Sequence, residues 1–235
     1  DDLKMVDWRV FARSDRHYLR TYEQETNMEC HIFLDSSASM GFGKAISKLE
    51  YSSFFAAALA YLVVRHNDRV SLQIFDDKVR NYYPPGSTQR HLHNLMHALE
   101  SNSAGNRTSA AEALKRSYPL LKRKGTLVVI SDFFDNAAAV FASLSPYLHR
   151  GFRIHLFHIL APEETELENL GLQTFLDMET GHRITAHTDN IRKLYRQAVQ
   201  DHITALRSMA VRRNVDYMTA TTDTHYFKLF DSLIR

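Results

Sequence analysis

The sequence predicts an α/β fold of three layers, in which helices cover both faces of a mainly parallel sheet. Short runs of strand length alternate along the chain with longer runs of helical period. Two of the strand-like runs, 28–34 and 126–130, are largely apolar, as strands buried on both faces are. The 235 residues, 44% of them hydrophobic and 24% charged, suffice for a large globular domain with a buried core.

The strands and helices can be placed from hydrophobic period and from turn and capping residues. The expected strands are 28–34, 69–75, 79–83, 126–130, 152–160 and 215–220, with a further hairpin of 174–178 and 183–186. The expected helices are about 48–66, 89–99, 108–121, 137–148, 189–213 and 226–234. Because strands and helices alternate, right-handed crossovers should connect a parallel sheet.

Local signals support several of these elements. Ser47 and Glu50 have the spacing of a capping box and start the helix over 48–66. That helix is apolar nearly all round, which predicts a central position covered on several sides. Asp76-Asp77 is expected to form the turn of the hairpin 69–83, and Pro84-Pro85-Gly86 to close it.

We expect two parts in the chain, an amino-terminal extension over 1–27 and one domain over 28–235. The segment 18–22 is a candidate edge strand within the extension. The chain does not begin with Met, and we expect it to belong to a longer protein whose missing part could carry an anchor or another domain. No apolar run reaches the ~18 residues of a membrane span, so a cytoplasmic location is expected.

Charge and cysteine content narrow the classes of function. With 29 basic and 27 acidic residues, the net charge of +2 argues against nucleic-acid binding through dense phosphate neutralisation. The basic run 122–124 is expected to be a solvated helix end. Glu163, Glu164, Glu166 and Glu168 are expected to form a solvated helix face, with an acidic docking surface as the alternative. The single cysteine, Cys30, lies in an apolar stretch and is expected to be a buried structural thiol.

Two predicted strands end in carboxylates, at Asp35 and Asp132. In a parallel sheet, ligands bind at the carboxyl ends of the strands, near the point where the strand order reverses. After the first strand, Asp35, Ser37 and Ser39 alternate along the loop, so three oxygen side chains can converge. Oxygen-only ligation that includes hydroxyls suits a hard cation such as Mg²⁺, with a position left open for an acidic side chain of a partner protein.

The loop Asp35-Ser36-Ser37-Ala38-Ser39 resembles the metal-ion-dependent adhesion site of von Willebrand factor type A domains, whose motif begins Asp-x-Ser-x-Ser. The resemblance implies a Rossmann-like sheet and a cation that is Mg²⁺, with Mn²⁺ or Ca²⁺ as alternatives. It also implies that Ser37 and Ser39 touch the metal directly. Asp35 and Asp132 would hold it directly or through water. Thr108, on a later loop, would exchange direct for water-mediated contact as the site changes state.

A narrower resemblance covers nearly the whole chain. The stretches that carry it are 6–13 (VDWRVFAR), 22–25 (YEQE), 34–40 (LDSSASM), 48–51 (KLEY), 175–181 (FLDMETG) and 220–223 (ATTD). They resemble the bacterial domain-of-unknown-function family fifty-eight, whose genes often neighbour MoxR-type AAA+ ATPases. This resemblance implies a non-catalytic binding protein that works with such an ATPase in the assembly or maturation of other proteins.

Several alternatives remain open at this point. The loop 35–39 could be an ordinary strand-to-helix turn, since Asp and Ser are common there. A Mg²⁺-dependent phosphohydrolase is the alternative function, although Ser37 stands where such an enzyme needs a second acid. A serine hydrolase lacks its Gly-x-Ser-x-Gly elbow. His93 and His97 could share a helix face and bind zinc, but no third ligand is evident.

Overall fold

The computed structural model describes residues 28–105, 109–167, 171–176, 178 and 181–233. The expected extension 1–27, with its candidate edge strand 18–22, lies outside the described residues, as does Thr108. Across the described ranges, the helices lack the combination of length and hydropathy that a bilayer-spanning segment requires.

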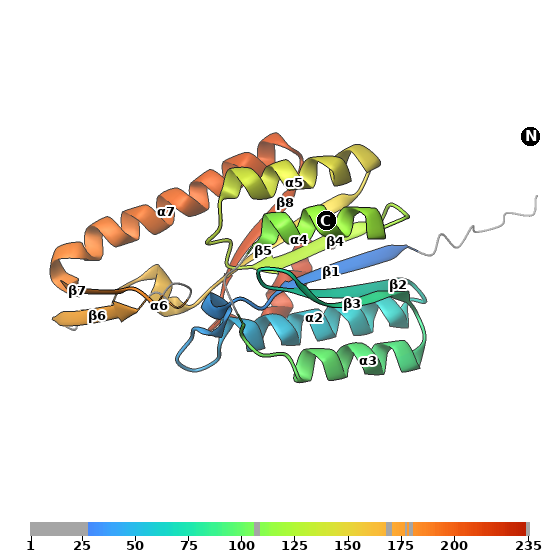
Figure 1. Cartoon of the computed structure of the whole chain (residues 1–235), viewed down its shortest axis with the longest axis horizontal. Coiled ribbons are helices and arrows are strands. Elements are labelled where there is room, and N and C mark those ends of the chain that lie inside the picture. The colour runs from blue at the N-terminus through green and yellow to red at the C-terminus, as the bar shows by residue number, and fades with distance from the viewer. Residues whose placement is uncertain (1–27, 106–108, 168–170, 177, 179–180, 234–235) are drawn as a thin grey trace, which may run out of the picture.

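A six-stranded sheet forms the centre of the domain (Figure 1). The strand order is β3-β2-β1-β4-β5-β8, and all neighbours are parallel except the β2–β3 hairpin. The strands are β1 (Glu29–Asp35), β2 (Arg69–Phe75), β3 (Val79–Gly86), β4 (Thr126–Ser131), β5 (Arg153–Leu160) and β8 (Asp216–Thr221). The predicted mainly parallel sheet is confirmed.

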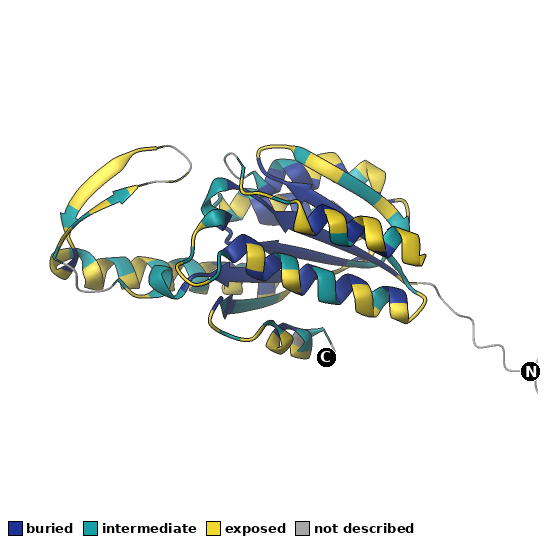
Figure 2. Ribbon diagram, turned by 90° about the horizontal axis from the view of Figure 1, so that it is seen from below, coloured by how far each residue is buried: buried dark blue, intermediate teal, exposed yellow. Residues whose placement is uncertain are grey.

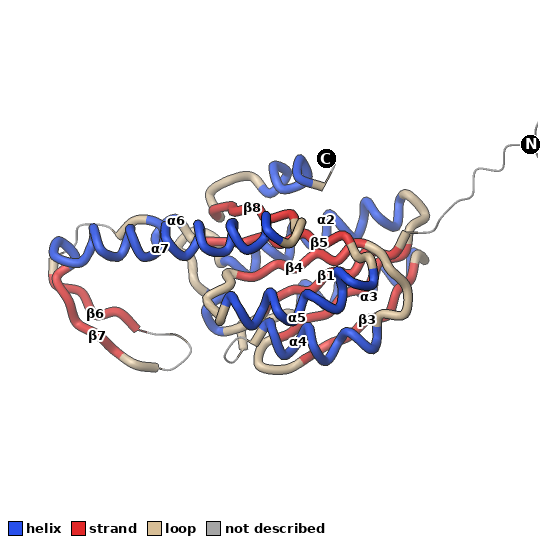
Figure 3. Tube along the Cα trace, turned by 90° about the horizontal axis from the view of Figure 1, so that it is seen from above, coloured by secondary structure: helices blue, strands red, loops and turns tan. Residues whose placement is uncertain are grey.

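Helices cover both faces of this sheet (Figures 1 and 3). On one face lie α2 (Lys48–Arg65), α3 (Gln89–Glu100) and the 3-10 helix η4 (Tyr226–Ser232). On the other face lie α4 (Ala110–Ser117), α5 (Ala137–Arg150) and the carboxyl-terminal part of α7 (Thr188–Arg212). Successive residues of β1 enter opposite cores, with Ile32 and Leu34 on the α2 side and Phe33 on the α5 side. This arrangement is the predicted three-layer α/β fold, with helices on both faces of a mainly parallel sheet.

Several local predictions are confirmed by side-chain contacts. Ser47 Oγ accepts a hydrogen bond from Glu50 N at 3.1 Å and so begins α2. Cys30 is buried in β1, and burial raises the pKa of its thiol to about 12. The basic run 122–124 is exposed.

Three elements differ from the sequence prediction. The Pro84-Pro85-Gly86 segment continues β3 instead of closing it, because β3 is an edge strand and needs no further N–H donors on its open side. The helix expected over 108–121 begins at Ala110 and ends at Ser117, since Pro119 lacks the N–H that would continue the α-helical ladder. The apolar helix α2 is not covered all round, and its outer face exposes Phe54, Tyr61 and Leu62.

A second, two-stranded sheet lies apart from the main one (Figures 2 and 3). It is the predicted hairpin, formed by β6 (Leu172–Leu176) and β7 (Arg183–His187), and none of its residues is buried. The single-turn helix α6 (Pro162–Thr165) leads toward it, and α7 leads back. We call the β6–β7 hairpin and the amino-terminal half of α7 the arm; it extends past the carboxyl ends of the main strands.

Candidate functional site

Four of the five predicted site residues lie at the carboxyl ends of β1 and β4, which are neighbours in the centre of the sheet: Asp35, Ser37, Ser39 and Asp132. From β1 the chain builds the sheet outward through β2 and β3, and then returns to the other side of β1 to add β4, β5 and β8. The gap between β1 and β4 is therefore the point where the strand order reverses. Loops diverge at such a point and leave room for a ligand.

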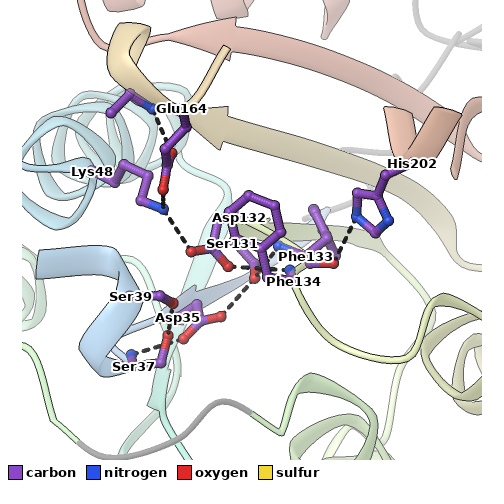
Figure 4. Close-up of polar contacts among 11 residues, drawn as sticks. Asp35, Ser37, Ser39, Lys48, Ser131, Asp132, Phe133, Phe134, Glu164 and His202 are labelled. Atoms are coloured by element: carbon purple, nitrogen blue, oxygen red, sulfur yellow. Dashed lines mark hydrogen bonds and ion pairs between the residues drawn. The ribbon is translucent and has the colours of Figure 1, made fainter. Parts of the chain in front are cut away.

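The loop after β1 turns its polar side chains inward (Figure 4). Asp35 and Ser37 are fully buried, and Ser37 N donates to Asp35 Oδ1 at 2.9 Å. The 3-10 helix η2 (Ala38–Gly41) follows at once. It brings Ser39 Oγ to 3.1 Å from Ser37 Oγ, so the two hydroxyls face the same space. The alternation of Asp35, Ser37 and Ser39 thus produces the predicted convergence.

The loop after β4 supplies the second carboxylate. Ser131 Oγ donates to Asp35 Oδ2 at 2.6 Å, which ties the two strand ends together. The next residues make a tight turn in which Phe133 adopts a left-handed φ of 48°. Phe133 N donates to Ser131 Oγ at 3.0 Å, and Phe134 N to Asp132 Oδ1 at 3.3 Å. Asp132 is fully buried and held in place by this turn.

A buried ammonium group is the part of the site that the sequence analysis missed. Lys48, the first residue of α2, is fully buried, and its Nζ lies 2.8 Å from Asp132 Oδ2 and 2.6 Å from Glu164 Oε1 (Figure 4). Glu164 belongs to α6, and its Oε2 accepts from Ala161 N at 2.8 Å. The expectation that residues 163–164 form a solvated face is wrong for Glu164, whose side chain is only 13% exposed.

The sequence contains only weak signals that Lys48 and Glu164 form an ion pair at this site. Lys48 lies in the stretch 48–51 that carries the family resemblance, but it reads as an ordinary first-turn residue beside its cap Ser47. Glu164 is far from Lys48 in sequence, and four acidic residues within 163–168 resemble a solvated segment. Only the folded topology brings α6 over the end of β4.

Burial and mutual repulsion dominate the electrostatics of the carboxylates. Burial, followed by the negative charge of Asp132, raises the pKa of Asp35 to about 7, although hydrogen bonds from Ser131 and Ser37 oppose this shift. Burial also raises the pKa of Glu164, against the lowering effect of Lys48. The ammonium group of Lys48 pairs with Asp132 and Glu164, and Asp35 is held by hydrogen bonds alone among the contacts described above.

A third loop approaches the site beside β2. Gly105 N donates to Ser36 O, in the loop after β1, at 2.7 Å, and Ser109 N donates to Asp76 O, just after β2, at 2.9 Å. Asp76, predicted as part of a turn, is fully buried and lies 3.3 Å from Arg80 Nε. The predicted ligand Thr108 belongs to this loop but lies outside the described residues.

The donor set fits a hard divalent cation. Its oxygens come from two hydroxyls and two carboxylates, the ligand types that Mg²⁺ prefers. Adjacent ligands in an octahedron with bonds of about 2.1 Å lie about 3 Å apart, and the oxygens of Ser37 and Ser39 are 3.1 Å apart. Among the described residues, no group of three or more His, Cys, Asp or Glu side chains is placed to hold a metal, so a cation here depends on the hydroxyls.

Solved structures with a similar fold cover nearly the whole domain. An aerotolerance-related membrane protein of Bacteroides fragilis, solved with multiple mutations to serines, superposes with a TM-score of 0.58 at 18% identity, over 88% of this chain and 98% of its own. The conserved hypothetical protein BatB of Bacteroides thetaiotaomicron gives a TM-score of 0.59 at 16% identity, over 88% of this chain and all of its own. At these identities the similarity shows the fold alone.

Sequence comparison gives the family. The Uncharacterized protein Rv1480 of Mycobacterium tuberculosis and the Uncharacterized protein Mb1516 of Mycobacterium bovis are each 26% identical to this chain over 188 residues, or 77% of it. The chain spans 58% of the length of these relatives. Residues 1–205 match the family described as "Protein of unknown function DUF58". Since the match covers most of the sequence, the chain belongs to this family.

Proposed function

We propose that this protein is a non-catalytic module that binds a partner protein through a metal ion held by Asp35, Ser37, Ser39 and Asp132. The observation that carries the proposal is the convergence of two hydroxyls and two buried carboxylates at the point where the strand order reverses. By resemblance Thr108 is the fifth ligand, and the ion is Mg²⁺, with Mn²⁺ or Ca²⁺ as alternatives.

The ligand types explain how such a site would attract a partner. Hydroxyl ligands carry no charge, and Lys48 already neutralises part of the charge of Asp132 at 2.8 Å. When bound here, a divalent cation would keep a strong preference for one more carboxylate oxygen from outside. The protein's own residues would position that cation and exclude water from behind it, because Asp35, Ser37 and Asp132 are fully buried.

The same residues give little support to catalysis. A phosphatase that forms an aspartyl phosphate on Asp35 needs a second acid two residues later, and that residue is Ser37. Lys48 is held between Asp132 and Glu164, so it is poorly placed to serve as a general base. We therefore propose binding without turnover.

The proposed partner is a MoxR-type AAA+ ATPase, which follows from the family resemblance. An acidic side chain on the ATPase would complete the coordination of the metal. The pair would act in the assembly or maturation of other proteins.

Co-purification of the full chain with the MoxR-type ATPase of the same organism tests this function. We expect binding in Mg²⁺, and a loss of at least tenfold with a chelator, with Asp35→Asn or with Ser39→Ala. Asp77→Asn, in the exposed turn between β2 and β3, is the matched control and should bind like the wild type. If neither the chelator nor the substitutions at Asp35 and Ser39 weaken binding of the ATPase, the proposal of metal-dependent binding is overturned.

A further inference from the structure

A groove of about 650 Å³ lies between the loop after β1 and the arm. Ser39 and Phe42 form part of its wall on the side of the domain, and Phe175, Leu176 and Tyr195 form part of its wall on the arm. Ser39 belongs both to the proposed metal site and to the wall of this groove, so the two are adjacent. A ligand held at Ser39 by a carboxylate has the groove directly beside it.

The arm side of the groove is apolar and open to solvent. Leu176 of β6 is 53% exposed, and Met178 beyond it is 44% exposed. Phe42, across the groove, is also exposed. Large apolar side chains that gather on an open surface mark a binding site more often than scattered ones do. Each of these side chains would gain from burial against a ligand.

Polar groups in the groove add a charge pattern. Lys44 lines the groove on the same side as Ser39, and its positive charge favours an acidic ligand at that end. Glu163 and Glu164 also line the groove, so Lys44 offers a positive charge on a wall that elsewhere carries carboxylates.

We propose that the groove binds an extended segment of a partner protein that carries one acidic side chain close to bulky apolar side chains. The carboxylate would reach the site at Ser39, and the apolar side chains would pack against Phe42, Phe175 and Leu176. This inference rests on the proposed metal-dependent binding and specifies the chemistry of the partner.

A selection of random twelve-residue peptides displayed on phage tests the inference, with the full chain as bait in Mg²⁺ and elution at low pH, so that the selection itself does not require the metal. We expect the eluted peptides to share an Asp or Glu within about three residues of Leu, Ile, Met or Phe. The affinity of a synthetic copy of one such peptide is then measured by fluorescence anisotropy. Leu176→Gln should weaken binding about tenfold, the effect of losing one buried apolar side chain.

Leu172→Gln is the matched control. Leu172 is an exposed leucine of the same strand, β6, and it does not line the groove. The control should bind within twofold of the wild type, and the circular dichroism of both variants should match that of the wild type.

The outcomes separate this inference from the proposed function. Metal-dependent binding that is unchanged by Leu176→Gln would overturn the groove while leaving the metal site. Binding that Leu176→Gln weakens, but that neither the chelator nor Asp35→Asn weakens, would overturn the metal-dependent function. It would also overturn the placement of the peptide's carboxylate at Ser39. A selection that enriches no acidic peptide overturns the inference. The inference is also overturned if the wild-type chain is a dimer and the Leu176→Gln variant is a monomer, because the groove would then hold a second copy of this chain.

Discussion

The charged side chains around Asp132 reduce the free-energy cost of burying one another. Lys48 Nζ contacts both Asp132 and Glu164, and Asp35 is stabilised by hydrogen bonds from Ser131 Oγ and Ser37 N. Burying a charge costs several kcal/mol unless it is paired and hydrogen-bonded. Lys48 therefore acts as a fixed cation at one carboxylate of the site, and the remaining negative charge around Asp35 favours a second cation.

Replacing Lys48 with Met should show this role. The variant leaves Asp132 and Glu164 buried beside each other without a counter-charge, and we expect it to lose about 3–5 kcal/mol in free energy of unfolding with a chelator present. Mg²⁺ should recover part of the loss, because the metal would compensate Asp132. Denaturant unfolding with and without Mg²⁺ measures both effects. Lys115→Met, at an exposed position of α4, is the control, and an equal small loss in both variants would contradict the prediction.

A buried histidine at the other end of β1 predicts a pH dependence of stability. His31 is fully buried, with Nδ1 2.7 Å from Ser71 Oγ and Nε2 3.7 Å from Glu29 Oε2. Burial, followed by the positive charge of Arg69, lowers its pKa to about 4 from an ordinary value of 6.5. Between these values the unfolded chain binds a proton that the folded chain does not. Stability therefore falls as the pH drops from 6.5 to about 4 and changes no further below that.

His31→Gln isolates this contribution. Between pH 7 and pH 5 the wild type should lose about 2 kcal/mol more free energy of unfolding than the variant loses, since the variant has no proton to gain at this position. Denaturant unfolding at the two pH values gives the difference. His66→Gln removes an exposed histidine after α2 and should leave the wild-type pH dependence in place. If His31→Gln and the wild type lose equal stability, the histidine is not neutral in the fold.

At the scale of elements, the sequence predicts well wherever a local signal decides the structure. The start of α2 follows from Ser47 as its cap, and the carboxylates at the ends of β1 and β4 follow from where the apolar runs stop. The β6–β7 hairpin and the length of α7 also agree with prediction. These features depend on residues close together in the chain.

The prediction fails where tertiary contacts decide. Only the later part of α7, including Leu206 and Ala210, reaches the core, and Leu194 is 73% exposed. Lys48 and Glu164 were missed because their partners come from other elements, and no spacing in the sequence signals such a pair. Periodicity identifies an apolar face but does not say whether this chain or a partner covers it.

The hairpin can be removed to test how far the arm is independent of the domain. Its two ends meet where Thr188 N donates to Gly171 O at 2.9 Å, so residues 172–187 can be replaced by an Asn-Gly turn. No residue of β6 or β7 is buried, and we expect the free energy of unfolding to change by less than about 1 kcal/mol. Denaturant unfolding checks this, and a loss of several kcal/mol would mean that the hairpin supports the sheet. Binding of the selected peptides should be lost at the same time.

At the scale of the whole molecule, the sheet separates two cores and places the candidate site between them. One core lies under α2 and α3, and the other under α4, α5 and α7 (Figures 1 and 2). β1 and β4 contribute side chains to both cores, so their carboxyl ends are fixed from two sides. A site built on such strands is rigid, while the arm beside it is exposed. A metal site fixed by the sheet, beside an exposed groove, suits a protein that holds one acidic group of its partner firmly.

Because the site joins β1 to β4, metal binding should stabilise the whole domain. A ligand at about a hundred times its dissociation constant adds about 2.7 kcal/mol to the free energy of unfolding. For a chain of this length that corresponds to a rise of about 5–10 °C in the unfolding midpoint. Thermal unfolding in chelator, Mg²⁺ and Mn²⁺ measures the rise. Asp35→Asn and Ser39→Ala should abolish it, and Asp77→Asn should keep it. Equal midpoints for the wild type in chelator and in millimolar metal would mean that the chain alone does not hold the ion, and that Lys48 is the only cation the folded site needs.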